Sequence, residues 1–100
     1  MKRLWLDPYV ADTLLRDLAG HDRRPSAFLV YVHLWGATGG RKGATATMSL
    51  GRLAEETGLS KRAVQAAIAH LERRKLIRVY RPAATAVPSY EVLRPWKRGK

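Results

Sequence analysis

The stretch GLSKRAVQAAIAHLERRKLI, residues 58–77, decides the fold of this chain. Its apolar side chains recur at every third or fourth position, which predicts a helix over residues 61–74. The helix begins with Lys61 and Arg62, although the N-terminus of a helix carries a partial positive charge that favours acidic residues. A bound anion such as a phosphate group would offset this unfavourable placement of charge.

The residues before this helix predict a second, shorter helix. Ser49 is a candidate N-cap for a helix over residues 50–57, and Gly58 is expected to end that helix. Ser60 is then the candidate N-cap of the helix over residues 61–74. Two short helices joined by a three-residue turn that contains glycine form a helix-turn-helix.

Two strand-like segments follow. Residues 76–80, LIRVY, and residues 89–93, SYEVL, alternate and carry β-branched and aromatic side chains, which predicts a hairpin with a loop of roughly eight residues. A short strand near Ala46–Met48 would add a third strand. The expected fold class is therefore mainly α with a small β-hairpin (α+β), a winged helix-turn-helix.

Two further helices are predicted upstream. The first runs from Pro8 to Leu18, with Asp7 as a candidate N-cap, one apolar stripe and Gly20 closing it. The second runs from Pro25 to about Ala37 and is apolar almost all round, so we expect it to be the central core helix.

These elements predict three parts of the chain. They are an N-terminal extension with one helix (1–24), a winged helix-turn-helix domain (25–95) and a basic tail (96–100). Residues 4–18 carry more apolar side chains than one shallow contact needs. Either these side chains pack on their own domain, or they form a homodimer interface that would match a palindromic DNA site. A separate domain for a small-molecule effector is not evident.

The charge distribution indicates a polyanionic partner. The formal net charge is +11, and residues 41–100 hold 14 of the 19 Lys and Arg residues but only four of the eight acidic ones. Such asymmetry favours double-stranded DNA, with an anionic membrane surface as the weaker candidate. The chain has no cysteine and no long apolar run. We therefore expect a cytoplasmic, nucleoid-associated protein without a signal peptide or a transmembrane helix.

Enzyme chemistry is not indicated. His21, His33 and His70 are far apart and lack the partners of a metal site, and His70 is expected on the surface. The segment GGRKGAT, residues 39–45, lacks the spacing of a phosphate-binding P-loop and is interpreted as a flexible basic loop. The sequence predicts a non-enzymatic protein with no cofactor and no metal.

The outward face of the helix over residues 61–74 has side chains suited to a DNA groove. Arginine bonds bidentately to guanine and glutamine to adenine, whereas alanine lets the helix approach the bases closely. The candidate base-contacting residues are Arg62, Gln65, Ala66 and Ala69. The candidate phosphate-contacting residues are Ser60, Lys61, Arg73, Arg78, Arg81, Arg41 and Lys42.

From residue 49 to residue 93 the sequence resembles the winged helix-turn-helix domains of bacterial transcription regulators. The resemblance is carried by residues 50–81, LGRLAEETGLSKRAVQAAIAHLERRKLIRVYR. The upstream AFLVYVHLWGATGG is similar to the first helix of helix-turn-helix domains in plasmid replication initiators. The resemblance implies that five residues match positions facing DNA in those families: Ser60, Lys61, Arg62, Gln65 and Ala66.

Two departures from these families affect the wing. Glycine is common where Lys75 stands, so either a lysine adopts a left-handed conformation at a cost of about 1 kcal/mol or the helix ends differently. The wing tip AATAV, residues 83–87, is apolar rather than basic.

The favoured interpretation is a sequence-specific DNA-binding transcription regulator whose helix over residues 61–74 enters the major groove. One alternative is a DNA-binding domain of the replication-initiator type. The other is a winged helix that contacts protein through its apolar wing tip and Trp96.

Overall fold

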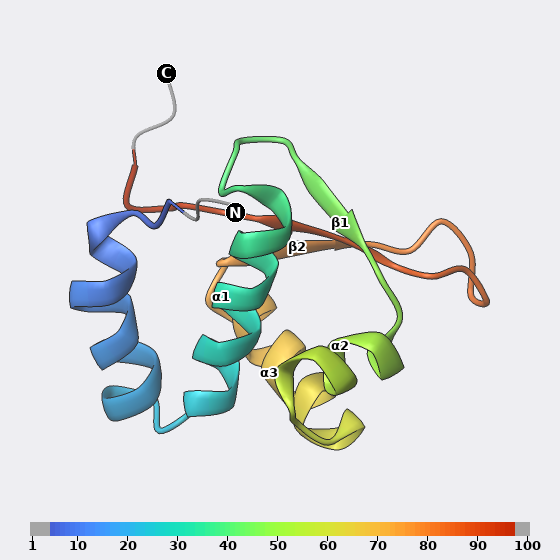
Figure 1. Ribbon diagram of the computed structural model, residues 1–100, viewed down its shortest axis with the longest axis horizontal. Coiled ribbons are helices and arrows are strands. Elements are labelled where there is room, and N and C mark those ends of the chain that lie inside the picture. Colours follow the sequence, from blue (N-terminus) through green and yellow to red (C-terminus); the bar gives the residue numbers. More distant parts are fainter. Residues whose placement is uncertain (1–4, 98–100) are drawn as a thin grey trace.

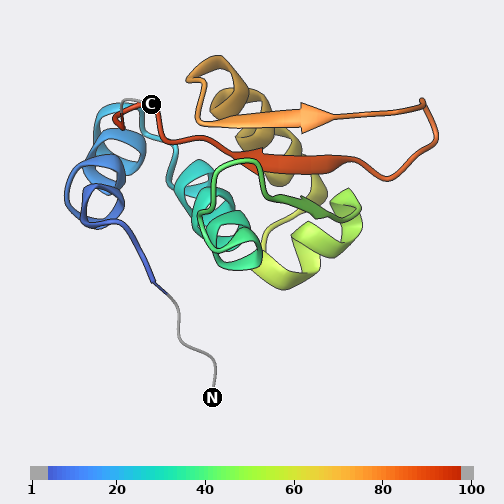
Figure 2. The same cartoon turned by 90° about the horizontal axis from the view of Figure 1, so that it is seen from above.

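In the computed structural model, the structure describes residues 5–97. A three-stranded sheet lies across one end of a group of helices, and the loop between its last two strands extends beyond them (Figures 1 and 2). The elements in chain order are η1 (Val10–Leu14), η2 (Arg16–His21), α1 (Pro25–Thr38), β1 (Thr45–Thr47), α2 (Leu50–Thr57), α3 (Lys61–Arg73), β2 (Ile77–Tyr80) and β3 (Ser89–Val92). The α+β fold class predicted from the sequence is confirmed.

The sheet is antiparallel, with β3 between β1 and β2. Tyr90 of β3 lies opposite Ala46 on one side and Val79 on the other. The predicted hairpin and the predicted third strand are both present. The β2–β3 loop, residues 81–88, has the expected length and forms the wing.

Helix α1 is the central core helix, as its almost continuous apolar surface predicts. Its fully buried side chains include Val30, Tyr31, Leu34 and Trp35. The Tyr31 hydroxyl donates a 2.9 Å hydrogen bond to the carbonyl oxygen of Leu93, which ties the helix to the chain after β3. A buried tyrosine hydroxyl needs such a partner, because an unpaired polar group in a core is destabilising.

The N-terminal helix differs from the prediction. Asp7 accepts a 3.0 Å hydrogen bond from the backbone N–H of Tyr9, so it does cap the start. The helix continues past Gly20 to His21 and consists mostly of π-helical turns. Gly20 does not adopt the left-handed conformation that would end a helix there. Instead, the Asp22 N–H donates to the carbonyl of Asp17, five residues back, and the helix ends at His21, three residues later than predicted.

Most apolar side chains of residues 5–18 pack on their own domain. Val10, Leu14 and Leu18 form the predicted stripe and are buried. Leu6 and Tyr9 pack partly against the same core, whereas the large apolar side chains of Trp5 and Leu15 are exposed. The core therefore accounts for most of this apolar surface without a second copy of the chain, and Leu4 lies outside the described residues.

Trp96 also packs on this N-terminal helix. Its ring stacks on Tyr9 with centroids 4.4 Å apart, and its indole N–H donates to Asp7 at 3.3 Å. Internal stacking therefore uses one face of the Trp96 ring, which is half-buried. Within residues 5–97, no helix is long and apolar enough to cross a membrane, and no His, Asp and Glu side chains form a metal-binding group.

Candidate nucleic-acid interface

Two serine caps define the turn between α2 and α3. Ser49 accepts a 3.1 Å hydrogen bond from the backbone N–H of Arg52, and Ser60 accepts one of 3.0 Å from Ala63. Gly58 has φ 77°, the left-handed conformation that ends α2. Both predicted N-caps and the predicted glycine turn are confirmed. Each serine cap typically stabilises its helix by about 1 kcal/mol.

Helix α3 has one buried and one exposed face. Its buried residues are Val64, Ala67, Ile68 and Leu71, and they match the predicted core face. The four candidate base-contacting residues, Arg62, Gln65, Ala66 and Ala69, are all exposed. The helix thus presents two long hydrogen-bonding side chains and two methyl groups together, on a scaffold that holds it rigidly from behind.

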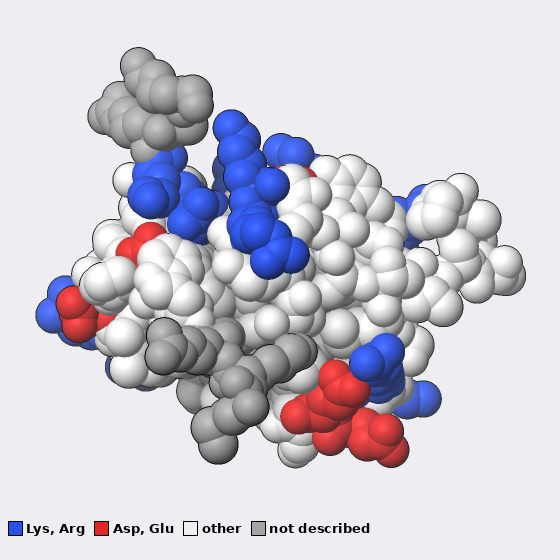
Figure 3. Space-filling view, turned by 45° about the horizontal axis from the view of Figure 1, so that its top comes forward, with Lys and Arg blue, Asp and Glu red and all other residues white. Residues whose placement is uncertain are grey.

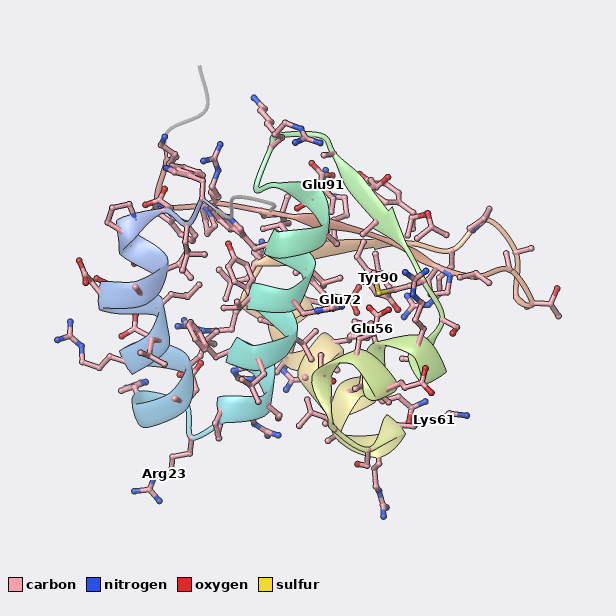
Figure 4. The ribbon with its side chains drawn as sticks, viewed as in Figure 1. Arg23, Glu56, Lys61, Glu72, Tyr90 and Glu91 are labelled. Carbon is pink, nitrogen blue, oxygen red and sulfur yellow. The ribbon has the colours of Figure 1, made fainter. Side chains whose placement is uncertain are left out.

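Cationic and hydrogen-bonding groups gather at the start of α3. Lys61 and Ser60 are exposed there, next to the free backbone N–H groups of the first turn. Lys61 also lies along the first turn of α2, since a Cβ added at Gly51 would lie 3.4 Å from Lys61 Cε (Figure 4). This end of α3 has no acidic residue in its first turn, so its partial positive charge is left for an external anion.

Helix α3 ends one residue earlier than predicted, in a Schellman motif that contains a lysine. Lys75 has φ 58°, and the N–H of Leu76 donates a 2.9 Å hydrogen bond to the carbonyl of Leu71. The N–H of Lys75 donates to the carbonyl of Glu72 at 3.0 Å. Lysine therefore takes the conformation usual for glycine, and the helix leads directly into β2.

An ion-pair cluster that the sequence did not indicate anchors the same end of α3. The carboxylate of Asp22 accepts a 2.8 Å hydrogen bond from His70 and forms an ion pair with Arg74 at 3.0 Å, and His21 lies 3.1 Å from it. The His70 side chain is only 14% exposed, so the expectation of a surface histidine is wrong. Burial alone would raise the pKa of Asp22. Hydrogen bonds from His70 and His21 and the charge of Arg74 outweigh burial and lower that pKa below its ordinary value.

The wing presents fewer free charges than expected. Arg78 is exposed but lies 3.5 Å from Glu91, and Tyr80 donates a 2.7 Å hydrogen bond to the same carboxylate. Arg81 is exposed at the base of the wing. The tip is apolar, with the Val87 residue 49% exposed. The structure therefore places Arg81 beside α3 with no ion-pair partner among the described residues, whereas Arg78 is partly neutralised.

A groove of about 580 Å³ separates the wing from α3. Its walls include Gln65 and Ala69 from α3 and Arg81 from the wing. Tyr90 forms part of this lining, and within residues 5–97 its hydroxyl is a buried side-chain polar atom without a hydrogen-bond partner. Burial raises the pKa of Tyr90, so the hydroxyl stays protonated at neutral pH.

The loop that carries Arg41 and Lys42 lies away from this interface. Residues 39–44 follow the C-terminus of α1, and Figure 1 shows them at the top of the molecule, whereas the turn from α2 to α3 lies at the bottom. Both residues are exposed. The groove brings Gln65, Ala69 and Arg81 together, but Arg41 and Lys42 do not line it. Arg73, near the end of α3, is exposed and lies 3.5 Å from His70.

Together the helix order, the sheet and the exposed face of α3 define a winged helix-turn-helix protein. A family model described as a helix-turn-helix domain matches residues 24–77, more than half of the chain, so the chain belongs to this family. A helix-turn-helix domain suggests DNA as the partner, and such domains are typically not enzymes. The chain matches no curated protein and no solved structure.

Proposed function

We propose that this protein binds a specific double-stranded DNA sequence and regulates transcription, as bacterial winged helix-turn-helix regulators do. The observation that carries the proposal is the exposed face of α3, where Arg62 and Gln65 stand among small alanines. Long side chains at Ala66 or Ala69 would hold the helix away from base edges. The alanines instead leave room for α3 to enter a major groove.

Each candidate residue has a distinct role in this proposal. Arg62 would bond to guanine, and Gln65 to adenine. The alanine methyl groups would contact the bases through apolar surface, including the methyl group of thymine. Ser60, Lys61 and the first backbone N–H groups of α3 would hold one phosphate, with Arg73, Arg78 and Arg81 contributing further charge along the backbone. A protein that binds chromosomal DNA in this way would be located at the nucleoid.

The test is selection of bound duplexes from a random pool, followed by measurement of affinity against salt concentration. One enriched motif together with a steep loss of affinity at higher salt would support the proposal. A palindromic motif would indicate binding as a dimer, and a promoter or an iterated origin as the natural site would separate a regulator from an initiator. No binding at moderate salt would overturn the proposal and favour a protein partner at the apolar wing tip.

A double variant makes this test specific to α3. Arg62→Ala with Gln65→Ala should remove the preference for the selected motif, because each good bidentate contact contributes roughly 1–3 kcal/mol of discrimination. Both residues are exposed, so the variant should keep its stability within about 0.5 kcal/mol. Retention of the full sequence preference would show that α3 does not read the bases.

A further inference from the structure

A second basic surface lies apart from α3. It consists of Arg41 and Lys42, which follow α1, and of Arg94 and Lys97, which follow β3. Figure 3 shows Lys and Arg side chains gathered on this part of the molecule. We call these four residues the distal basic surface. Two segments far apart in the sequence contribute to it, so only the folded chain assembles it.

The buried Trp35 ring contacts both segments that form this surface. The guanidinium carbon of Arg94 lies 5.8 Å from the centroid of the Trp35 ring, a cation–π distance. Gly40 packs on the same ring so closely that an added Cβ would lie 2.5 Å from it. Arg41 folds back over Gly39, where a Cβ would lie 2.6 Å from a guanidinium nitrogen. The buried indole thus positions the loop of residues 39–44 beside Arg94.

The charges of the distal basic surface are available to a ligand. Three arginines elsewhere pair with carboxylates: Arg52 with Glu56, Arg74 with Asp22, and Arg78 with Glu91. None of the four distal residues takes part in an ion pair within residues 5–97. The helix dipole stabilises a cation near the C-terminus of α1 by about 0.3–1 kcal/mol. This interaction explains why one of the four charges lies there, but not why all four do.

The position of this surface separates it from DNA held by α3. Figure 1 shows the distal loop at the top of the molecule, after the C-terminal end of α1, and the α2–α3 turn at the bottom. Figure 4 shows Lys61 at the α3 end, far from the loop. A phosphate held at Lys61 would therefore lie away from Arg41 and Lys42.

We propose that the distal basic surface binds the phosphate backbone of a second DNA duplex, so that one molecule bridges two DNA segments. This inference rests on the proposed binding of DNA by α3, which would keep the local concentration of DNA phosphate high around the protein. Flexible cations without a helix to enter a groove contact phosphates and not base edges, so the second duplex is bound without sequence preference.

The experiment captures one duplex with another. A biotinylated duplex that carries the selected motif is immobilised and loaded with protein, and a fluorescent duplex of unrelated sequence is then added. The test variant is Arg41→Gln/Lys42→Gln/Lys97→Gln, which leaves Arg94 on Trp35 undisturbed. The matched control, Arg16→Gln/Arg23→Gln/Arg24→Gln, removes the same number of exposed charges elsewhere.

We expect the wild type and the control to capture the fluorescent duplex in proportion to the protein loaded. The test variant should load normally but capture roughly tenfold less, with the salt dependence of capture reduced by about 0.9 for each lost phosphate contact. Equal capture by the test variant, or loading of the wild type without any capture, would overturn the bridging proposal and leave the function of α3 intact.

A failure of recognition by α3 gives a different result. If the wild type does not load on the first duplex, direct binding of the fluorescent duplex is compared between the wild type and the Arg41→Gln/Lys42→Gln/Lys97→Gln variant. The three glutamine substitutions should then weaken the salt-sensitive binding roughly tenfold. Binding that is unchanged by them would show that these residues do not hold DNA.

Discussion

Nε2 of His70 lies 2.8 Å from Oδ2 of Asp22, which joins helix α3 to the end of the N-terminal helix. The Asp22 carboxylate is 10% exposed and also forms an ion pair with Arg74, so one acidic group contacts two side chains at the C-terminal end of α3. The N-terminal extension therefore positions α3 as well as covering the core. The orientation of α3 depends on residues that lie outside the helix-turn-helix.

This cluster predicts a pH dependence of stability. The pKa of Asp22 is lowered in the folded protein, so its contribution is present above the ordinary pKa of about 3.8 and is lost as the pH falls through the lower, folded-state value. Urea unfolding measured from pH 7 to pH 3 should show this loss below about pH 4. The pKa of Glu56 is also lowered, by hydrogen bonds from Arg52 and His33, so wild type alone does not isolate Asp22.

Asp22→Asn provides the comparison. This variant should be less stable than wild type at pH 7, and the difference should shrink as the pH falls below about 4, because protonated wild type has lost the same charge. The two stability curves would run parallel over the whole range if Asp22 had the same pKa in the folded and unfolded states.

The left-handed lysine predicts a stabilising substitution. Lys75→Gly should raise the free energy of unfolding by about 1 kcal/mol, because glycine adopts φ 58° without the steric cost that a Cβ imposes. Lys75→Ala is the control, since it removes the charge but keeps the Cβ. Equal stability of the two variants in urea unfolding would mean that the charge, and not the backbone, determines the effect.

Two buried tyrosines should respond oppositely to loss of the hydroxyl. Tyr31→Phe should lower the free energy of unfolding by about 1 kcal/mol, because its hydroxyl donates to the carbonyl of Leu93. Tyr90→Phe should raise it by about 1 kcal/mol, because the Tyr90 hydroxyl is buried without a partner. Calorimetry of both variants checks the pair. A loss of stability in Tyr90→Phe equal to that in Tyr31→Phe would reveal a partner for this hydroxyl.

The alanines on α3 predict a variant that folds but binds DNA poorly. Ala66→Leu adds a large side chain to an exposed helical position, so stability should stay within about 0.5 kcal/mol. Affinity for the selected duplex should fall about tenfold or more, equivalent to about 1.4 kcal/mol, because leucine holds the helix away from the bases. Ala11→Leu, an exposed position on the N-terminal helix, is the matched control and should bind as wild type does. If Ala66→Leu bound the selected duplex as tightly as wild type does, the exposed face of α3 would not lie close to the DNA bases.

Local signals accounted for most of the fold. Ser49, Gly58 and Ser60 bond or adopt their conformations within a few residues, so their positions in the sequence predicted the ends of α2 and the start of α3. The exposed face of α3 followed from helical periodicity in the same way. The π-helical turns before Asp22 were not predicted, because the spacing of the apolar stripe is similar for closely related helical conformations.

Contacts between distant residues explain what the sequence could not indicate. His70 lies 48 positions after Asp22, and neither residue type favours this pairing over exposure to solvent. Charge alone groups Arg41 and Lys42 with the DNA-facing residues. The fold places them in the loop after the C-terminus of α1, away from the α2–α3 turn.

The sequence by itself determined the helix-turn-helix, its caps, the hairpin and the composition of the exposed α3 face, because these depend on interactions within one turn or one periodic segment. The tertiary structure alone decided which charges remain free, which are paired, and which share a surface. Ion pairing and burial depend on side chains brought together from distant segments, and only the packing of α1 against the other elements sets those distances.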